Sequence, residues 1–221
     1  MTRYREDFPC SIAYPPDRLK GALPEVVSKA GLSQLRIAET EKYAHVTFFL
    51  SGGDERELAG ERRILIPSPK VATYDMQPEM SANLVTDALL KEVASDNCPD
   101  VTILNFANAD MVGHSGIVDA AVLAVQTIDQ CLERIVPAFV GKGGTVAVTA
   151  DHGNVEQMLD EQSGGIHTAH TSNPVPFVVC SNALVNRRLK DGGRLCDIAT
   201  TLLPIIDLDK GEGMDGVDLF A

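Results

Sequence analysis

The feature that most constrains the fold is a set of short apolar runs separated by helical patterns. Residues 101–106, 145–150 and 176–180 are β-prone and carry almost no charge, and residues 117–136 repeat apolar side chains at helical spacing. Strands without polar alternation are typical of a parallel sheet, because its crossover helices bury both faces. We therefore expect an α/β fold with a largely parallel sheet and helices on both faces.

Weaker patterns complete this outline. Further helices are expected at 23–30, 81–94 and 195–206, a short strand at 35–38, and either helix or strand, with helix favoured, at 42–50. Gly31 would end the first helix, Ser81 would cap the second, and Pro204 would perturb the last. Residues 51–80 are rich in turn-forming residues, and no strand is expected there.

Composition narrows the classes of partner. The chain has 221 residues, 44% of them hydrophobic, which suits one large domain or one domain with an appendage. Its net charge of −12 makes nucleic acid an unexpected partner. No apolar run reaches the roughly 18 residues of a membrane span, and the amino-terminal ten residues do not resemble a signal peptide. The five scattered cysteines form no C-x-x-C pair, so we expect reduced thiols in a cytoplasmic protein.

Four of the five histidines lie in three polar clusters that border the apolar runs. These clusters are Asp110 with His114 after 101–106, Asp151 with His152 after 145–150, and His167 with His170 before 176–180. The carboxyl ends of parallel strands meet at one edge of a sheet, where ligands gather. Asp110 and Asp151 are therefore expected to converge, although 41 residues separate them.

This convergence favours a metal site. Two neighbouring aspartates repel each other, and a divalent cation removes the conflict while neutral imidazoles add further ligands. Oxygen and nitrogen donors without thiolate suit Mn²⁺ or Zn²⁺ better than Ca²⁺. The expected ligands are Asp110, His114, Asp151, His152 and His170. Five ligands exceed one tetrahedral site with an open position, which indicates two metals, about 3.5–4 Å apart in phosphoryl-transfer enzymes.

Simpler interpretations apply to single members of this set. One Asp-His-Gly sequence alone is usually a turn or a helix cap, and only the three clusters together outweigh that reading. His167 is interpreted as a loop residue or as a partner of a ligand, not as a ligand. His45 lies on an apolar stretch and is interpreted as a satisfied core histidine. The Gly-Lys-Gly-Gly run at 141–144 lacks the phosphate-loop pattern and is interpreted as a turn.

Six segments carry a resemblance to a known family. They are QLRIAETEKYAHVTFF at 34–49, IPSPKVATYD at 66–75, QPEMSA at 77–82, NFANADMVGH at 105–114, TADHGN at 149–154 and TAHTSNPVP at 168–176. Together they resemble the cofactor-independent phosphoglycerate mutases over nearly the whole chain. TADHGN alone would indicate only the wider alkaline phosphatase superfamily, and the segment at 34–49 narrows the resemblance to the mutases. Ser115 stands where the family is expected to have threonine.

The resemblance implies an alkaline phosphatase-like fold and a glycolytic and gluconeogenic isomerase activity. Such enzymes interconvert 3-phosphoglycerate and 2-phosphoglycerate through a phosphoserine intermediate at a two-metal site. The metals are two divalent cations, with Mn²⁺ expected and Zn²⁺ or Co²⁺ as alternatives. The implied roles are Asp110, His114 and His170 on one metal, Asp151 and His152 on the other, and Lys42 facing the phosphoryl group. Without the resemblance, Lys42 would be interpreted as an ordinary surface lysine.

The same resemblance implies that part of the enzyme lies elsewhere. Family members are more than twice as long, and their nucleophilic serine and one further aspartate precede an inserted, substrate-gripping domain. Residues 1–20 are interpreted as the tail of that domain and a hinge, and residues 21–221 as the C-terminal part of the metal-binding phosphatase-like domain. We expect an incomplete sheet with an exposed edge and an exposed apolar face. The isolated chain would bind metal weakly, first at the three-ligand site, and would not turn over substrate, and the intact protein would be a monomer.

Two alternatives remain open from the sequence. The chain can belong to another metalloenzyme of the superfamily, such as a phosphopentomutase or a phosphodiesterase, although the run ETEKY at 39–43 argues against this. It can instead be a non-catalytic fragment, or one half of a split protein that pairs with a separate N-terminal chain.

Overall fold

The computed structural model describes residues 19–160 and 163–220, and the expectation for residues 1–18 lies outside these ranges. The described helices are α1 (Leu23–Lys29), α2 (Ala82–Ala94), α3 (Asn108–Gly113), α4 (Val118–Val140) and α5 (Asp197–Leu202). The strands are β1 (Gln34–Glu39), β2 (Glu61–Ile66), β3 (Val101–Asn105), β4 (Val146–Thr149) and β5 (Phe177–Cys180). The 3₁₀ turns are η1 (Thr40–Lys42), η3 (Tyr74–Met76), η4 (Asn182–Leu184) and η5 (Leu203–Ile206), and η2 (His45–Phe49) is a π-helix.

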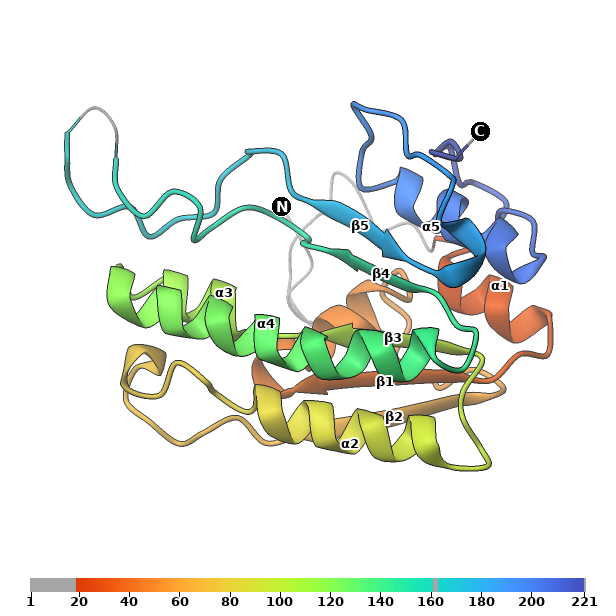
Figure 1. Ribbon diagram of the computed structural model, residues 1–221, viewed down its shortest axis with the longest axis horizontal. Coiled ribbons are helices and arrows are strands. Elements are labelled where there is room, and N and C mark those ends of the chain that lie inside the picture. The colour runs from red at the N-terminus through yellow and green to blue at the C-terminus, as the bar shows by residue number, and fades with distance from the viewer. Residues whose placement is uncertain (1–18, 161–162, 221) are drawn as a thin grey trace, which may run out of the picture.

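The centre of the molecule is a parallel sheet of order β2-β1-β3 (Figure 1). All six residues of β1 are buried, because strands pair with both of its edges and helices cover its faces. Leu35 and Ile37 pack against Val85 and Leu89 of α2 on one face. On the other face, the Gln34 amide donates to the carbonyl of Pro24 in α1 at 3.0 Å. The expected α/β class with a parallel sheet flanked by helices is confirmed.

The remaining two strands depart from the expectation of one parallel sheet. β4 and β5 pair antiparallel with each other, from Val146 opposite Cys180 to Thr149 opposite Phe177, as a separate ribbon. Residues 150–160 and 163–176 lie outside this ribbon and form a long loop excursion (Figure 1). The expectation that residues 145–150 and 176–180 belong to the same parallel sheet as residues 101–106 is therefore wrong within the described residues, because β4 and β5 pair only with each other.

Several other local expectations need correction. β2 lies inside 51–80, where no strand was expected, because its first three residues are charged and give no apolar strand pattern. Residues 42–50 are helical, as favoured, but the helix is the π-helix η2 and not a regular α-helix. The Thr47 hydroxyl donates to the carbonyl of Tyr43 at 2.7 Å. Ser81 does precede α2, but its hydroxyl donates to the carbonyl of Pro67 at 2.7 Å and does not cap the helix.

The long helix α4 packs closely against α3 through small residues. It buries Ala120, Ala121 and Ala124 in a cluster that includes Ala107 and Val112, which flank or belong to α3. Small side chains let the two helix backbones approach closely, so α3 is held at the end of β3.

Another side of α4 exposes apolar side chains to solvent. Val118, Val122 and Val125 are 46%, 49% and 44% exposed, although they belong to the apolar stripe recognised in the sequence. No helix of the described residues is long and apolar enough to cross a membrane. The four described cysteines, Cys98, Cys131, Cys180 and Cys196, are free.

Candidate metal centre

Asp110 is the centre of the candidate site. It follows β3 by five residues and lies in the first turn of α3, with a side chain only 13% exposed. Lys42 Nζ lies 2.5 Å from Asp110 Oδ2, and Asn154 Nδ2 donates to Asp110 Oδ1 at 2.8 Å. Lys42 is itself buried, so the pair is well shielded from water.

The surroundings of Asp110 keep its carboxylate ionised. Burial by itself raises the pKa of Asp110, but hydrogen bonds from Lys42 and Asn154 and the positive charge of Lys42 outweigh burial and lower the pKa to about 2. An ionised carboxylate at neutral pH is the form that a metal ion requires.

Two histidines converge on the same carboxylate oxygen. His170 Nε2 lies 2.9 Å and His114 Nε2 3.1 Å from Asp110 Oδ1, and the two nitrogens are 3.2 Å apart. His114 comes from the end of α3, whereas His170 comes from the loop excursion before β5. The fold therefore joins residues 56 positions apart in sequence at one point.

The tautomer of His114 favours a cation between its Nε2 atom and the carboxylate of Asp110. His114 Nδ1 lies 2.7 Å from the carbonyl oxygen of Thr168, which can only accept, so Nδ1 carries the proton. In the neutral ring, Nε2 then carries a lone pair that faces the carboxylate of Asp110. Two lone pairs at this distance repel unless a proton or a cation lies between them. The donor set therefore fits a metal ion.

The spacing of the donors supports the same conclusion. Zinc-like ions bind imidazole and carboxylate at about 2.0–2.2 Å. Three donors separated from one another by 2.9 to 3.2 Å can all contact one such ion. Mixed nitrogen and oxygen donors without thiolate suit Mn²⁺, Zn²⁺ or Co²⁺.

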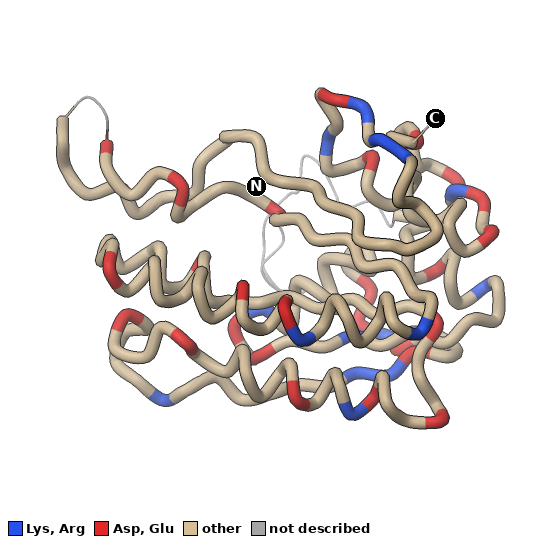
Figure 2. Tube along the Cα trace, in the orientation of Figure 1, with Lys and Arg blue, Asp and Glu red and all other residues tan. Residues whose placement is uncertain are grey.

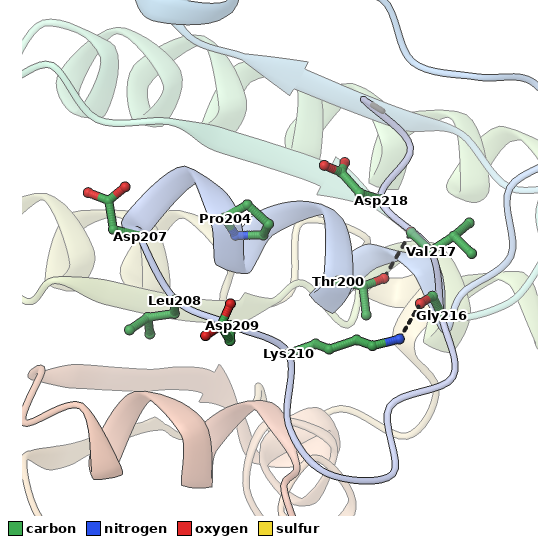
Figure 3. A pocket seen from close by; sticks show the side chains of 9 residues that line it. All are labelled: Thr200, Pro204, Asp207, Leu208, Asp209, Lys210, Gly216, Val217 and Asp218. Carbon is green, nitrogen blue, oxygen red and sulfur yellow. Dashed lines mark hydrogen bonds between the residues drawn. The ribbon is translucent and has the colours of Figure 1, made fainter.

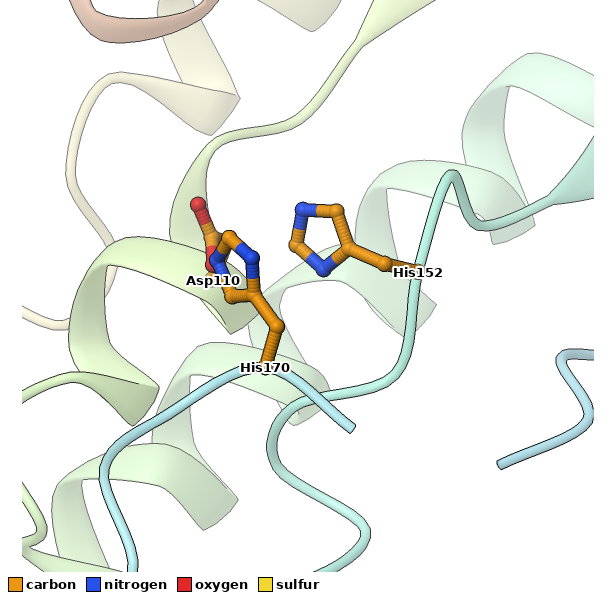
Figure 4. Close-up of side chains that lie close together, drawn as sticks. All are labelled: Asp110, His152 and His170. Carbon is orange, nitrogen blue, oxygen red and sulfur yellow. The ribbon is translucent and has the colours of Figure 1, made fainter. Parts of the chain in front are cut away.

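His152 adds a fourth donor beside this trio. Its ring stacks on His170 with 3.7 Å between ring centroids, and ligand atoms of Asp110, His152 and His170 lie within 4.8 Å of one another (Figure 4). Asp151 lies further out, with a side chain 46% exposed and its Oδ1 atom 3.6 Å from His152 Nε2. The five side chains that the sequence singled out therefore occupy one region, with Asp151 at its periphery.

The other two histidines lie outside this donor set. His167 Nδ1 is 3.1 Å from the carbonyl of Gln157, a contact within the loop excursion. His45 packs edge-on against Phe49, and its buried Nδ1 has no hydrogen-bond partner, so the interpretation as a satisfied core histidine is wrong. Burial, followed by the charge of Lys42, lowers the pKa of His45, and the charges of Asp151 and Asp110 oppose this shift. His45 therefore borders the site.

The charge distribution makes the loop excursion attractive to cations. No lysine or arginine occurs between Lys142 and Arg187, and the charged residues of that excursion in Figure 2 are all acidic. Lys42 enters from the other side of the site, after β1. An acidic region of this kind raises the local concentration of divalent cations.

A hollow beside α5 lies apart from this cluster and has no comparable chemistry. It has a volume of ≈ 650 Å³ and lies beside α5 and the chain that follows it (Figure 3). The Thr200 hydroxyl donates to the carbonyl of Val217, and Lys210 Nζ donates to that of Gly216, so these polar groups are already partnered. No residue that lines this hollow belongs to the Asp110 cluster.

An α/β sheet with a carboxylate and several imidazoles gathered beyond a strand end is typical of a metal-binding α/β protein. The chain belongs to the Metalloenzyme superfamily, whose family model matches residues 12–210. Within it, the chain is similar to 2,3-bisphosphoglycerate-independent phosphoglycerate mutases, which confirms the resemblance carried by the six segments.

The most informative relatives cover the chain almost completely. Mutase 1 of Methanosarcina acetivorans is 55% identical over 219 residues, which is 99% of this chain and 42% of that protein. The Clostridium botulinum mutase is 55% identical over 220 residues, 99% of this chain and 43% of that protein. A crystal structure of Leishmania mexicana phosphoglycerate mutase at low cobalt concentration matches with a TM-score of 0.80 and 26% identity, over 88% of this chain and 38% of that one. The chain thus spans less than half the length of these relatives.

Proposed function

We propose that this chain supplies the metal-binding part of an enzyme that interconverts 3-phosphoglycerate and 2-phosphoglycerate. The observation that carries the proposal is the convergence of His114 and His170 on Asp110, in a chain 55% identical to such mutases. The intact enzyme would be monomeric and would act in the cytoplasm, as part of glycolysis and gluconeogenesis.

The proposed ligands fall into two groups. Asp110, His114 and His170 would hold one divalent cation, and Asp151 and His152 would help to hold a second. Mn²⁺ is the proposed ion, with Zn²⁺ and Co²⁺ as alternatives. Bound cations would supply positive charge that stabilises the transferring phosphoryl group.

Lys42 would provide a fixed positive charge for the same step. Its ammonium group is buried beside Asp110, so its orientation is set before substrate arrives. A lysine in this position can donate hydrogen bonds to phosphoryl oxygens as negative charge develops on them.

The group that accepts the phosphoryl, a serine that forms the phosphoserine intermediate, would come from sequence outside these 221 residues. Among the described residues, no serine hydroxyl has a hydrogen bond to Asp110 or to the four clustered histidines. The nearest serine in sequence, Ser115, donates to the carbonyl of Val112 at 2.6 Å. We therefore propose that the isolated chain binds metal but does not catalyse the interconversion.

Metal titration tests the ligand assignment. We expect the 221-residue chain to bind Mn²⁺ in calorimetry. Asp110→Asn is expected to weaken the first binding event by about 100-fold or more, because losing a ligand should cost more than the 10–100-fold typical of losing a residue that hydrogen-bonds a ligand. The matched control is Asp129→Asn, a change at an exposed residue of α4, and this variant is expected to bind Mn²⁺ like the unmodified chain. Equal Mn²⁺ affinity of Asp110→Asn and the control would show that Asp110 is not a metal ligand.

A coupled assay tests the activity. The isolated chain is expected to show no turnover of 3-phosphoglycerate, whereas a chimera in which it replaces the matching part of the Methanosarcina acetivorans mutase is expected to be active. Turnover by the isolated chain would refute the proposed external serine. An inactive chimera that folds and binds Mn²⁺ would refute the proposed reaction.

A further inference from the structure

Two of the site histidines, His152 and His170, lie on separate loops that contact each other. The loop after β4 bears His152, and the loop before β5 bears His170. They meet in a short antiparallel bridge in which the Thr171 amide donates to the carbonyl of Gly153 at 2.9 Å. Thr171 directly follows His170, and Gly153 directly follows His152.

The carboxylate of Glu156 spans this junction. Its Oε2 atom accepts the backbone N–H of Asn154 at 2.6 Å. Its Oε1 atom accepts the hydroxyl of Thr171 and the side-chain amide of Asn173, the latter at 3.0 Å. One side chain thereby holds residues that follow His152 and His170.

The surrounding atoms require a group that only accepts. Both carboxylate oxygens face donors, so a glutamine would turn its NH₂ group toward at least one of them. Gly153 leaves the necessary space, because a Cβ there would overlap the Thr171 hydroxyl and the Glu156 carboxylate. Glu156 is exposed, and its position therefore depends on these hydrogen bonds and not on burial.

The same junction reaches Asp110. Asn154, whose N–H is bound by Glu156, donates its side-chain amide to the Asp110 backbone carbonyl at 3.2 Å and to Oδ1 at 2.8 Å. The loop geometry set at Glu156 thus extends to the carboxylate on which the imidazoles converge.

We infer that Glu156 is a positioning residue that joins the His152 loop to the His170 loop and fixes the spacing of the metal-binding side chains. This inference rests on the proposed metal site. Glu156 does not touch the metal donors themselves and acts through Asn154 and Thr171.

The test compares Glu156→Gln with Glu133→Gln, an exposed control on α4, in the 221-residue chain. Calorimetry with Mn²⁺ is expected to show about tenfold weaker binding for Glu156→Gln and no change for the control. Amide hydrogen exchange is expected to accelerate at Thr171 but not in β1. Thr171→Val removes the hydroxyl and should reproduce both effects, whereas Thr171→Ser keeps the hydroxyl and should show neither. The double variant Glu156→Gln with Thr171→Val should lose less Mn²⁺ affinity than the sum of the two single losses.

Each outcome decides between separate claims. Unchanged affinity and unchanged Thr171 exchange in Glu156→Gln would overturn the inference. If the unmodified chain binds no Mn²⁺, the proposed metal site fails, and Thr171 exchange alone still decides whether Glu156 joins the loops. If Glu156→Gln does not fold, the Thr171→Val and Thr171→Ser pair decides, and equal behaviour of these two would contradict the inference.

Discussion

Asp110 shows how one residue can be both a structural and a functional centre. Lys42 lies at one of its oxygens, and Asn154, His114 and His170 lie at the other. Its low pKa, about 2, results from the hydrogen bonds and positive charge that outweigh its burial. Such a carboxylate costs little to deprotonate, so a cation can bind at neutral pH without displacing a proton.

At this scale Lys42→Met separates metal binding from catalysis. In the chimera with the Methanosarcina acetivorans mutase, kcat is expected to fall by about 10²–10³-fold, as when one hydrogen-bond donor to a developing oxyanion is removed. Mn²⁺ affinity is expected to rise, because a buried positive charge beside Asp110 no longer repels the cation. Exposed Lys29→Met is the control. Weaker Mn²⁺ binding together with an unchanged kcat would show that Lys42 acts through structure alone.

The sequence predicts the site residues better than the residues that support them. Asp110 and the histidines stand out because aspartate and histidine occur together directly beyond two apolar runs and shortly before a third. Asn154 is visible within the Asp-His-Gly-Asn motif, but nothing in the pattern indicates that its amide holds Asp110. Glu156 looks like any exposed acidic residue, and its role depends on a loop contact 15 residues away that no local pattern encodes.

At the scale of elements, local periodicity succeeds where helices are regular and fails where context decides. α2 and α4 are confirmed because their apolar spacing is long and uninterrupted. β2 was missed because its start, Glu61 to Arg63, is charged, and these charges are neutralised by pairing, with Arg63 Nε 2.5 Å from Glu61 Oε1. The parallel direction expected for β4 was wrong, because an apolar run does not specify whether the neighbouring strand is parallel or antiparallel.

The close contact between α3 and the His152 loop can be tested by enlarging a glycine in α3. A Cβ at Gly113 would overlap the side chains of Asn154 and Val155. Gly113→Ala is therefore expected to displace Asn154 from Asp110, to cost about 1–3 kcal/mol of stability and to weaken Mn²⁺ binding. Gly165→Ala is the control, since among the described residues a Cβ there would contact only the Ser163 hydroxyl, at 3.2 Å. Chemical denaturation and calorimetry measure both effects, and equal results for the two variants would contradict the packing argument.

At the scale of the whole molecule, the exposed side of α4 bears on how this chain is completed. Helices of α/β folds normally bury their larger apolar residues, yet here the alanines are buried while Val118, Val122 and Val125 are nearly half exposed. The relatives are more than twice as long as the part that this chain matches. We therefore expect the rest of the enzyme to cover this stripe.

Val122→Glu tests that expectation by comparing two contexts. In the 221-residue chain the side chain is 49% exposed, so the substitution is expected to change the free energy of unfolding by no more than about 0.5 kcal/mol. In the chimera with the Methanosarcina acetivorans mutase, the same change would bury an unpaired carboxylate and is expected to cost about 2–4 kcal/mol. Gln126→Glu on an exposed part of the same helix controls for the added charge. Urea denaturation of both proteins measures the difference in the free energy of unfolding. Equal costs in the two contexts would mean that another surface of this chain contacts the rest of the mutase in the chimera.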